Sequence, residues 1–320
     1  MFIISDGRII LDTEIDSSGA ESDVKSLSGK LSSLASNALG SVAKITAGMM
    51  TVATGAVAAL TKASVEQYAE YEQLVGGVET LFKNSSDKVM EYANNAYKSA
   101  GMSANEYMNT ITGFAASLLQ GLGGDTEKAA QIGNMAVEDM SDNANKMGTS
   151  MEMIQNAYQG FAKANYTMLD NLKLGYGGTK TEMERLLADA QKISGVKYDI
   201  SNFNDIIEAI HVIQEQMGIT GTTAKEAAST IEGSLNMTKS AWTNLLTGMA
   251  DDNANFDTLI DNLVNSVSAF GDNILPRIEI TIKGIGQLVE KLLPPIVTRL
   301  PQLISDILPS LLNAGVQMVG

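Results

Sequence analysis

The chain contains no cysteine, and only one histidine and one tryptophan among its 320 residues. Without cysteine, it can form neither a disulfide framework nor a thiolate site. A single histidine also removes the usual general-base pairs and most sets of zinc ligands. Aromatic residues make up only 5% of the chain, which is unusual for an enzyme of this length. We therefore predict that the protein is not an enzyme and holds no metal or cofactor.

Proline is absent from the first 275 residues, and all five prolines lie in the last 45. Because proline disrupts helix interiors, its absence over this distance favours helix. The composition changes near residue 272, where we expect a domain boundary.

Basic residues are also scarce, since 37 acidic residues outnumber 22 basic ones and give a formal charge of −15. Such a charge repels phosphate backbones and argues against sequence-specific nucleic-acid binding. The N-terminal MFIISDGRIILD has no basic stretch followed by a long apolar run, so it does not predict a secretory signal.

Apolar residues recur at helical spacing through most of the chain. We predict an all-α fold of amphipathic helices joined by glycine-containing turns, elongated or loosely bundled, after a short β-strand at residues 7–16. Ser103, Asp125 and Ser150 are expected to cap helices. A capping box at Thr223 and Glu226 is expected to open a helix that runs to about Gly248. A coiled-coil-like seam is predicted at Val65, Tyr68, Tyr71, Val75, Val78 and Phe82.

The pattern divides the chain into four parts. Residues 1–40 form the N-terminal strand and a Ser/Gly-rich helical linker, and residues 41–63 form an apolar helix of small residues. Residues 64–271 form a multi-helix region. Residues 272–320 form an apolar amphipathic segment punctuated by proline.

Two apolar stretches are candidates for membrane contact or for close helix packing, and both alternatives remain open. Residues 45–60 carry no charge and place small residues on one helix face. Residues 288–312 present one wide apolar face. The candidate residues are Gly48, Met49, Met50, Val52, Gly55, Leu292, Leu293, Ile296, Leu300, Ile304 and Leu308.

The stretch NLKLGYGGTKTEMERLL (171–187) resembles a phosphate-binding loop at first sight. The match fails because Thr179 separates Gly178 from Lys180, and because the preceding residues have helical rather than strand spacing. We predict a helix corner instead. Gly175, Gly177 and Gly178 end one helix, and Thr179 with Glu182 opens the next as a capping box.

No other stretch predicts chemistry. His211 has no matching ligand at useful spacing and is expected to be a surface or packed helix residue. Residues 138–146 and 202–208 are rich in acidic and amide groups but lack the spacing of a calcium loop. We predict that both are solvated turns or faces.

Several stretches carry a family likeness. They are YEQLVGGVETLF (71–82), NAYKSAGMSANEYM (95–108) and the long stretch from NAYQGFAKANYTMLDNLKLGYGG to RLLADA (156–190). The opening DGRIILDTEIDSSG (6–19) and the tail LPPIVTRLPQLISDILPSLL (293–312) extend it. Together they are similar to the tail tape measure proteins of phages and prophages of Gram-positive bacteria.

The resemblance implies a structural protein, made in the host cytoplasm, that fills the tail tube lumen of the virion and sets tail length. It also implies release ahead of the DNA, with a passage formed through the host membrane. The implied partners are the tail tube protein, tail assembly chaperones, distal tail or baseplate proteins and further copies of the chain.

One helix of 320 residues would span roughly 480 Å at about 1.5 Å per residue, which is short for such tails. We therefore expect an N-terminal portion of a longer product, or a short or truncated prophage version. The alternative function is a secreted, membrane-active or pore-forming helical protein that inserts the two apolar stretches.

Overall fold

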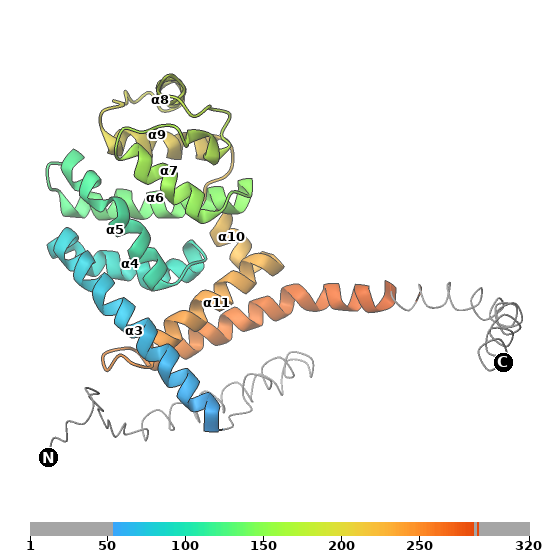
Figure 1. The fold of residues 1–320 in the computed structure, drawn as a ribbon. Coiled ribbons are helices and arrows are strands. Elements are labelled where there is room, and N and C mark those ends of the chain that lie inside the picture. The colour runs from blue at the N-terminus through green and yellow to red at the C-terminus, as the bar shows by residue number, and fades with distance from the viewer. Residues whose placement is uncertain (1–53, 285–286, 288–320) are drawn as a thin grey trace, which may run out of the picture. The chain divides into compact units, whose positions relative to one another are not determined.

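The computed structural model describes residues 54–284 and 287, and this part of the chain is all-α, as predicted (Figure 1). No strand occurs within these residues, while the predicted strand at 7–16 lies outside them. The chain divides into two compact units, residues 1–270 and 271–320. In the second unit the described residues are helical.

In the described part of the first unit, turns and loops connect the helices, and two 3-10 helices, η1 and η2, lie between them (Figure 1). Residues 256–270 are also helical. The bounds are α3 Thr54–Phe82, η1 Lys83–Ser85, α4 Ser86–Ser99, α5 Ala104–Gly121, α6 Thr126–Met147, α7 Met151–Phe161, η2 Leu169–Leu172, α8 Lys180–Ser194, α9 Phe203–Gln216, α10 Thr222–Ser229 and α11 Ile231–Gly248.

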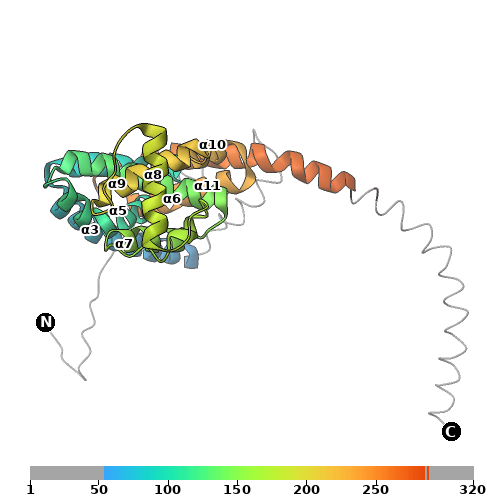
Figure 2. The same cartoon turned by 90° about the horizontal axis from the view of Figure 1, so that it is seen from above.

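Within the first unit the helices are packed in successive layers (Figure 1). Helices α3 and α11 lie at one end, α4 and α5 follow, and α8 and α9 lie at the other end. Helix α6 is central and contacts α3, α4, α5, α7, α9 and α10. Viewed from above, α8 crosses over α9, which it contacts (Figure 2).

A large apolar core joins helices α3 to α9, and a smaller one joins α4, α10, α11 and residues 256–270. Phe82, Tyr107, Met108, Leu118 and Tyr158 are among its fully buried side chains. Burying each such side chain contributes about 1.5–3 kcal/mol. Residues 54–270 therefore form a compact bundle, whereas the sequence left an elongated and a loosely bundled arrangement open.

Three predicted helix caps are confirmed. Ser103, Asp125 and Ser150 precede α5, α6 and α7, and each side chain accepts a backbone N–H three residues on, at 3.0 to 3.4 Å. These caps satisfy N–H groups that have no partner inside the helix. Local sequence therefore determines where these helices begin.

The helix predicted from Thr223 to Gly248 is wrong, because the chain breaks at Thr230 into α10 and α11. Thr230 is extended, and its hydroxyl caps α11 by accepting the Gly233 N–H at 3.0 Å. The predicted capping box at Thr223 is also wrong, since the N-cap of α10 is Gly221, which has no side chain. The cap of α10 comes instead from another helix, as described below.

The seam predicted along α3 is buried at only one end. Val78 and Phe82 are fully buried, whereas Val65 is 56% exposed. The C-terminal half of α3 enters the large core, with Leu74 and Val75 packed against it. Helical periodicity thus predicted which face of α3 packs against other helices. It did not predict that only the C-terminal half of this face is buried.

Candidate functional site

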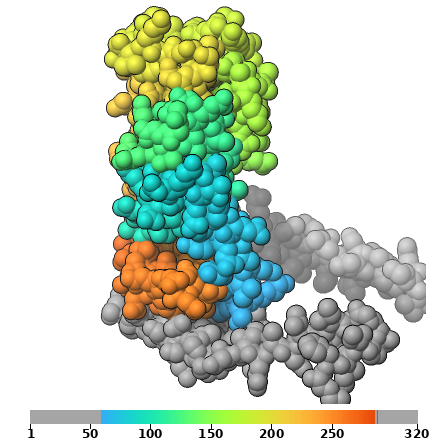
Figure 3. Space-filling view, turned by 90° about the vertical axis from the view of Figure 1, so that its left-hand side faces the viewer, coloured from blue at the N-terminus to red at the C-terminus, as the bar shows by residue number. Residues whose placement is uncertain are grey.

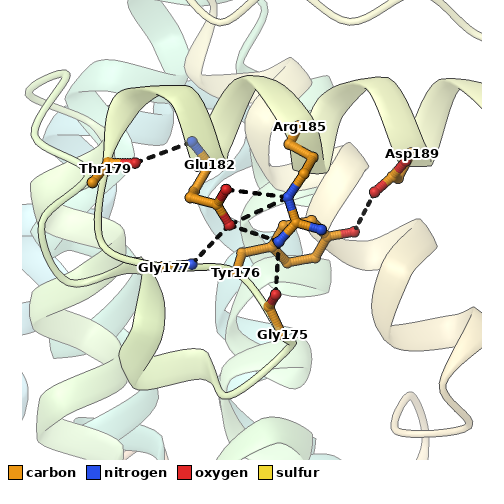
Figure 4. Close-up of polar contacts among 7 residues, drawn as sticks. All are labelled: Gly175, Tyr176, Gly177, Thr179, Glu182, Arg185 and Asp189. Carbon is orange, nitrogen blue, oxygen red and sulfur yellow. Dashed lines mark hydrogen bonds and ion pairs between the residues drawn. The ribbon is translucent and has the colours of Figure 1, made fainter.

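The glycine-containing corner before α8 is held by its own side chains (Figure 4). Thr179 is the N-cap of α8, and its hydroxyl accepts the Glu182 N–H at 3.2 Å. The Glu182 carboxylate turns back and accepts the Gly177 N–H at 3.1 Å. The Thr179 half of the predicted capping box is confirmed, whereas the other half is wrong, because Glu182 accepts the N–H of Gly177 and not that of Thr179. The two residues together hold the loop to the first turn of α8.

Arg185 extends this network to the loop (Figure 4). Its guanidinium donates to the Glu182 carboxylate at 2.6 Å and to the Gly175 carbonyl at 2.7 Å. It also lies 4.3 Å from the centroid of the Tyr176 ring, whose hydroxyl donates to Asp189 at 3.1 Å. The hydrogen bond from Arg185 holds the pKa of Glu182 below its ordinary value. Partial burial, followed by the hydrogen bond to Asp189, raises the pKa of Tyr176 to about 12.

The corner offers no cradle for phosphate. The Gly177 N–H is already bonded to the Glu182 carboxylate, and a carboxylate repels an anion. Lys180 is 67% exposed at its side chain and pairs with Glu184 at 3.7 Å. A Cβ on Gly178 would overlap the Thr167 carbonyl, so the glycine serves close backbone packing.

One detail of the predicted corner differs. Tyr166, Leu169 and Leu172 have helical spacing, yet only Leu169–Leu172 is helical, as the 3-10 helix η2. Lys173 then adopts a left-handed conformation, φ 53°, which ends this turn before the glycines are reached. The glycines therefore follow a short turn rather than an α-helix.

The acidic and amide residues of 138–146 were predicted to be solvated, and this is wrong for three of them, although Asn145 is exposed. Asp139 is 1% exposed, and Asp142 and Asn143 are also buried within α6. Asp139 lies three residues after the buried Ala136, and Asp142 and Asn143 lie three and four residues after Asp139, on the same helix face. This helical spacing is present in the sequence, and it could have been used to predict that these polar residues are buried.

Residues 202–208 were likewise expected to be solvated, but their N-terminal part is buried. Phe203 and Asn204 open α9 and are almost completely covered. The Asn204 amide donates to the carbonyl of Leu118 on α5 at 3.4 Å, and its backbone N–H is capped by Asn202 at 3.1 Å. These amides join two helices.

His211 has a partner that the sequence spacing did not reveal. Its Nδ1 lies 2.9 and 3.0 Å from the two carboxylate oxygens of Asp139, which is 72 residues away on α6. Burial raises the pKa of Asp139 to about 6, despite the opposing hydrogen bond from His211. The same hydrogen bond raises the pKa of His211, and the nearby Glu215 and Asp142 add to the increase.

Asp142 lies one turn along α6 and caps α10. Its two oxygens accept the backbone N–H groups of Gly221 at 2.5 Å and Thr223 at 2.7 Å. Burial raises the pKa of Asp142, while these two hydrogen bonds lower it. The carboxylate thus supplies the N-cap that Gly221 cannot provide itself.

Ser141 precedes Asp142 on α6, and its hydroxyl donates to the Ala100 carbonyl at 2.7 Å. Within residues 54–284 and 287, no group of three or more acidic or histidine side chains is arranged to hold a metal ion. Asp139, Asp142 and His211 join helices α6, α9 and α10 through these hydrogen bonds.

Most of the predicted membrane-contact residues lie outside the described residues. Gly55 falls in the first turn of α3, and the other ten lie in 1–53 or 288–320. Among the helices that are described, none combines the length and apolar character needed to cross a bilayer.

Comparisons with protein-family models, with curated proteins and with solved structures found no match. A function can therefore be inferred only from the sequence and the structure of this chain. The stretches 71–82, 95–108 and 156–190 all contribute to the large core of the first unit.

Proposed function

We propose that the chain is a structural phage tail protein of the tape measure type. It sets tail length during assembly, fills the tail tube lumen, and is released to help DNA cross the host envelope. The main support is that the three stretches that resemble this family meet in one helical core. Phe82, Tyr107 and Tyr158, one from each stretch, are all fully buried there.

The polar clusters of the described region give secondary support, because their contacts maintain the fold. Glu182 binds the loop that precedes α8, Asp142 caps the N-terminus of α10, and Asp139 pairs with His211. We therefore propose a structural role without catalysis. The formal charge of −15 suits a protein that fills a lumen through which DNA must slide, since like charges repel.

The proposed partners follow from this role. They are the tail tube protein around the chain, assembly chaperones before the tube closes, distal tail or baseplate proteins, and further copies of the chain. The chain is made in the host cytoplasm and is carried in the virion. Its proline-punctuated segment, residues 272–320, is the proposed membrane-contacting part during ejection.

The compact fold refines how this chain would set length. In an extended helix each residue adds about 1.5 Å. In the first unit the chain folds back, so that the Ala104 N–H reaches the Asn244 side chain at 2.8 Å across 140 residues. We assign the length-setting role to chain outside residues 54–270, with this unit acting as a folded module.

The test is to delete the gene in its natural host and examine the particles by electron microscopy. We expect heads without tails, restored to normal particles by the intact gene. Mass spectrometry of purified normal tails should detect peptides from residues 54–270. Normal tails in the deletion strain, or tails without these peptides, would overturn the proposal.

A further inference from the structure

A cavity of about 330 Å³ lies in the first unit, between α3, α4, the start of α5, the end of α11 and the residues that follow α11. In Figure 3 the orange residues that follow α11 lie side by side with the blue and cyan residues of α3 and α4. Five asparagines line it, and they come from α4, α11, the loop after α11 and the helix at 256–270. They are Asn94, Asn244, Asn253, Asn255 and Asn262.

Asn244 is the best-fixed polar group of the cavity. It is only 9% exposed, and its side-chain oxygen accepts the Ala104 N–H at 2.8 Å. Because an amide is planar, fixing the oxygen also fixes the NH₂ group on its other side. No described residue accepts a hydrogen bond from that NH₂ group. Asn244 therefore holds two N–H donors ready in the wall of the cavity.

The charge of the lining narrows the class of ligand. Among the described residues, Asp251 is the one charged residue of the lining, and none of them adds a lysine, arginine or histidine. A lining of this kind disfavours phosphates and carboxylates. The amides and Asp251 instead supply both donors and acceptors, which hydroxyl groups can satisfy in either direction. Tyr71 adds a flat aromatic side chain to the wall.

The walls are held close by tight helix packing. A Cβ on Gly248, at the end of α11, would overlap the Leu259 side chain on the helix that follows. Ser240 on α11 also donates to the Gly101 carbonyl at 3.0 Å, beside the start of α5. The cavity is therefore bounded by elements whose positions are fixed, as pre-formed ligand sites usually are.

We propose that this cavity binds a neutral, polyhydroxylated ligand of the size of one sugar ring. Its volume is at the lower end of the range of about 300–1,000 Å³ that is typical of small-molecule sites. The fixed NH₂ group of Asn244 and the carboxylate of Asp251, one oxygen of which also accepts the Asn253 N–H at 2.9 Å, provide the polar contacts. This site is independent of the tail function proposed above, and either proposal can fail without the other.

The test is a titration of the isotope-labelled 320-residue chain with glucose and with N-acetylglucosamine at millimolar concentration, followed by NMR. We expect saturable shifts at Asn244, Thr247 and Asn262, which line the cavity. Asn244→Ala should weaken binding about tenfold, the effect of losing roughly one hydrogen bond. Asn262→Ala should weaken it as well, without removing the contact to Ala104.

Asn109→Ala is the matched control, because Asn109 is exposed on α5 and does not line the cavity. It should bind as the wild type does. Circular dichroism checks that each variant folds. If Asn244→Ala does not fold, the binding of Asn262→Ala tests the proposal. The proposal is overturned if neither sugar produces saturable shifts, or if the cavity variants bind as tightly as Asn109→Ala. Binding of a neutral peptide in place of both sugars would also overturn it.

Discussion

Two polar clusters in this protein use similar groups in opposite surroundings. The corner before α8 joins Glu182 and Arg185 at the surface, whereas Asp139 is buried against the partly exposed His211, with Asp142 one turn away. In the corner, hydrogen bonds hold the pKa of Glu182 low, while burial raises that of Asp139. Removing one side chain of the exposed pair should therefore cost little stability, because water can solvate the group that remains. Removing the partner of the buried Asp139 should cost much more, because water does not reach its carboxylate.

The largest effect is expected from breaking the buried pair. At pH 8, His211→Leu leaves the Asp139 carboxylate buried without its hydrogen-bond partner, and we expect a loss of about 3–5 kcal/mol in the free energy of unfolding. Urea unfolding measures the change. The double variant Asp139→Asn/His211→Gln, which retains shape and hydrogen bonding, should be much closer to the wild type. A loss below about 1 kcal/mol in the single variant would contradict a buried, mutually dependent pair.

A somewhat smaller effect is expected at Asp142. Asp142→Ala removes the acceptor for the N–H groups of Gly221 and Thr223, and we expect a loss of about 2–3 kcal/mol. Thermal and urea unfolding would report it. Glu79→Ala, an exposed position on α3, is the control and should change stability by less than about 0.5 kcal/mol. Equal effects in the two variants would show that α10 does not need this cap.

The buried pair should also give stability a distinctive pH dependence. The pKa of Asp139 is raised from 3.8 to about 6, so its contribution is complete below pH 3.8 and is lost as pH rises through about 6. The pKa of His211 is also raised, so the stability that its protonated form contributes is lost as pH rises above 6.5. Relative to Asp139→Asn/His211→Gln, the wild type should lose stability as pH rises from about 4 to above 6.5. Parallel curves for the two proteins would contradict these shifts.

The smallest effects are expected in the corner. Thr179→Ala removes a helix cap and should cost about 1 kcal/mol. Arg185→Ala breaks an exposed ion pair and should cost less than about 1 kcal/mol, and its effect should shrink further at high salt. Urea unfolding at low and high salt separates the two. A loss at Arg185 as large as that at His211 would remove the distinction between the clusters.

The sequence predicted those features whose partners are near in the chain. Ser103, Asp125, Ser150 and Thr179 each bond to the N–H three residues later, so a short pattern contains both partners. The all-α class follows from helical spacing over many residues in the same way. Local rules therefore located helix starts and apolar faces.

Features that depend on distant partners could not be predicted in this way. Asp139 and His211 are 72 residues apart, and the cap of α10 comes from Asp142, 79 residues before Gly221. Only the packing of α6 against α9 and α10 brings them together. The cavity beside Asn244 likewise needs α11 to lie against α3 and α5, so no short pattern reveals it.

The most direct test of the tape measure proposal is the tail length of particles whose gene carries a helical insert after Gly284. An insert of about 40 helical residues should lengthen tails by roughly 60 Å, at about 1.5 Å per residue. Electron cryomicroscopy of these particles and of wild-type particles measures the difference. Longer tails in that proportion are the expected result, and tails of unchanged length would contradict a length-setting role for this chain.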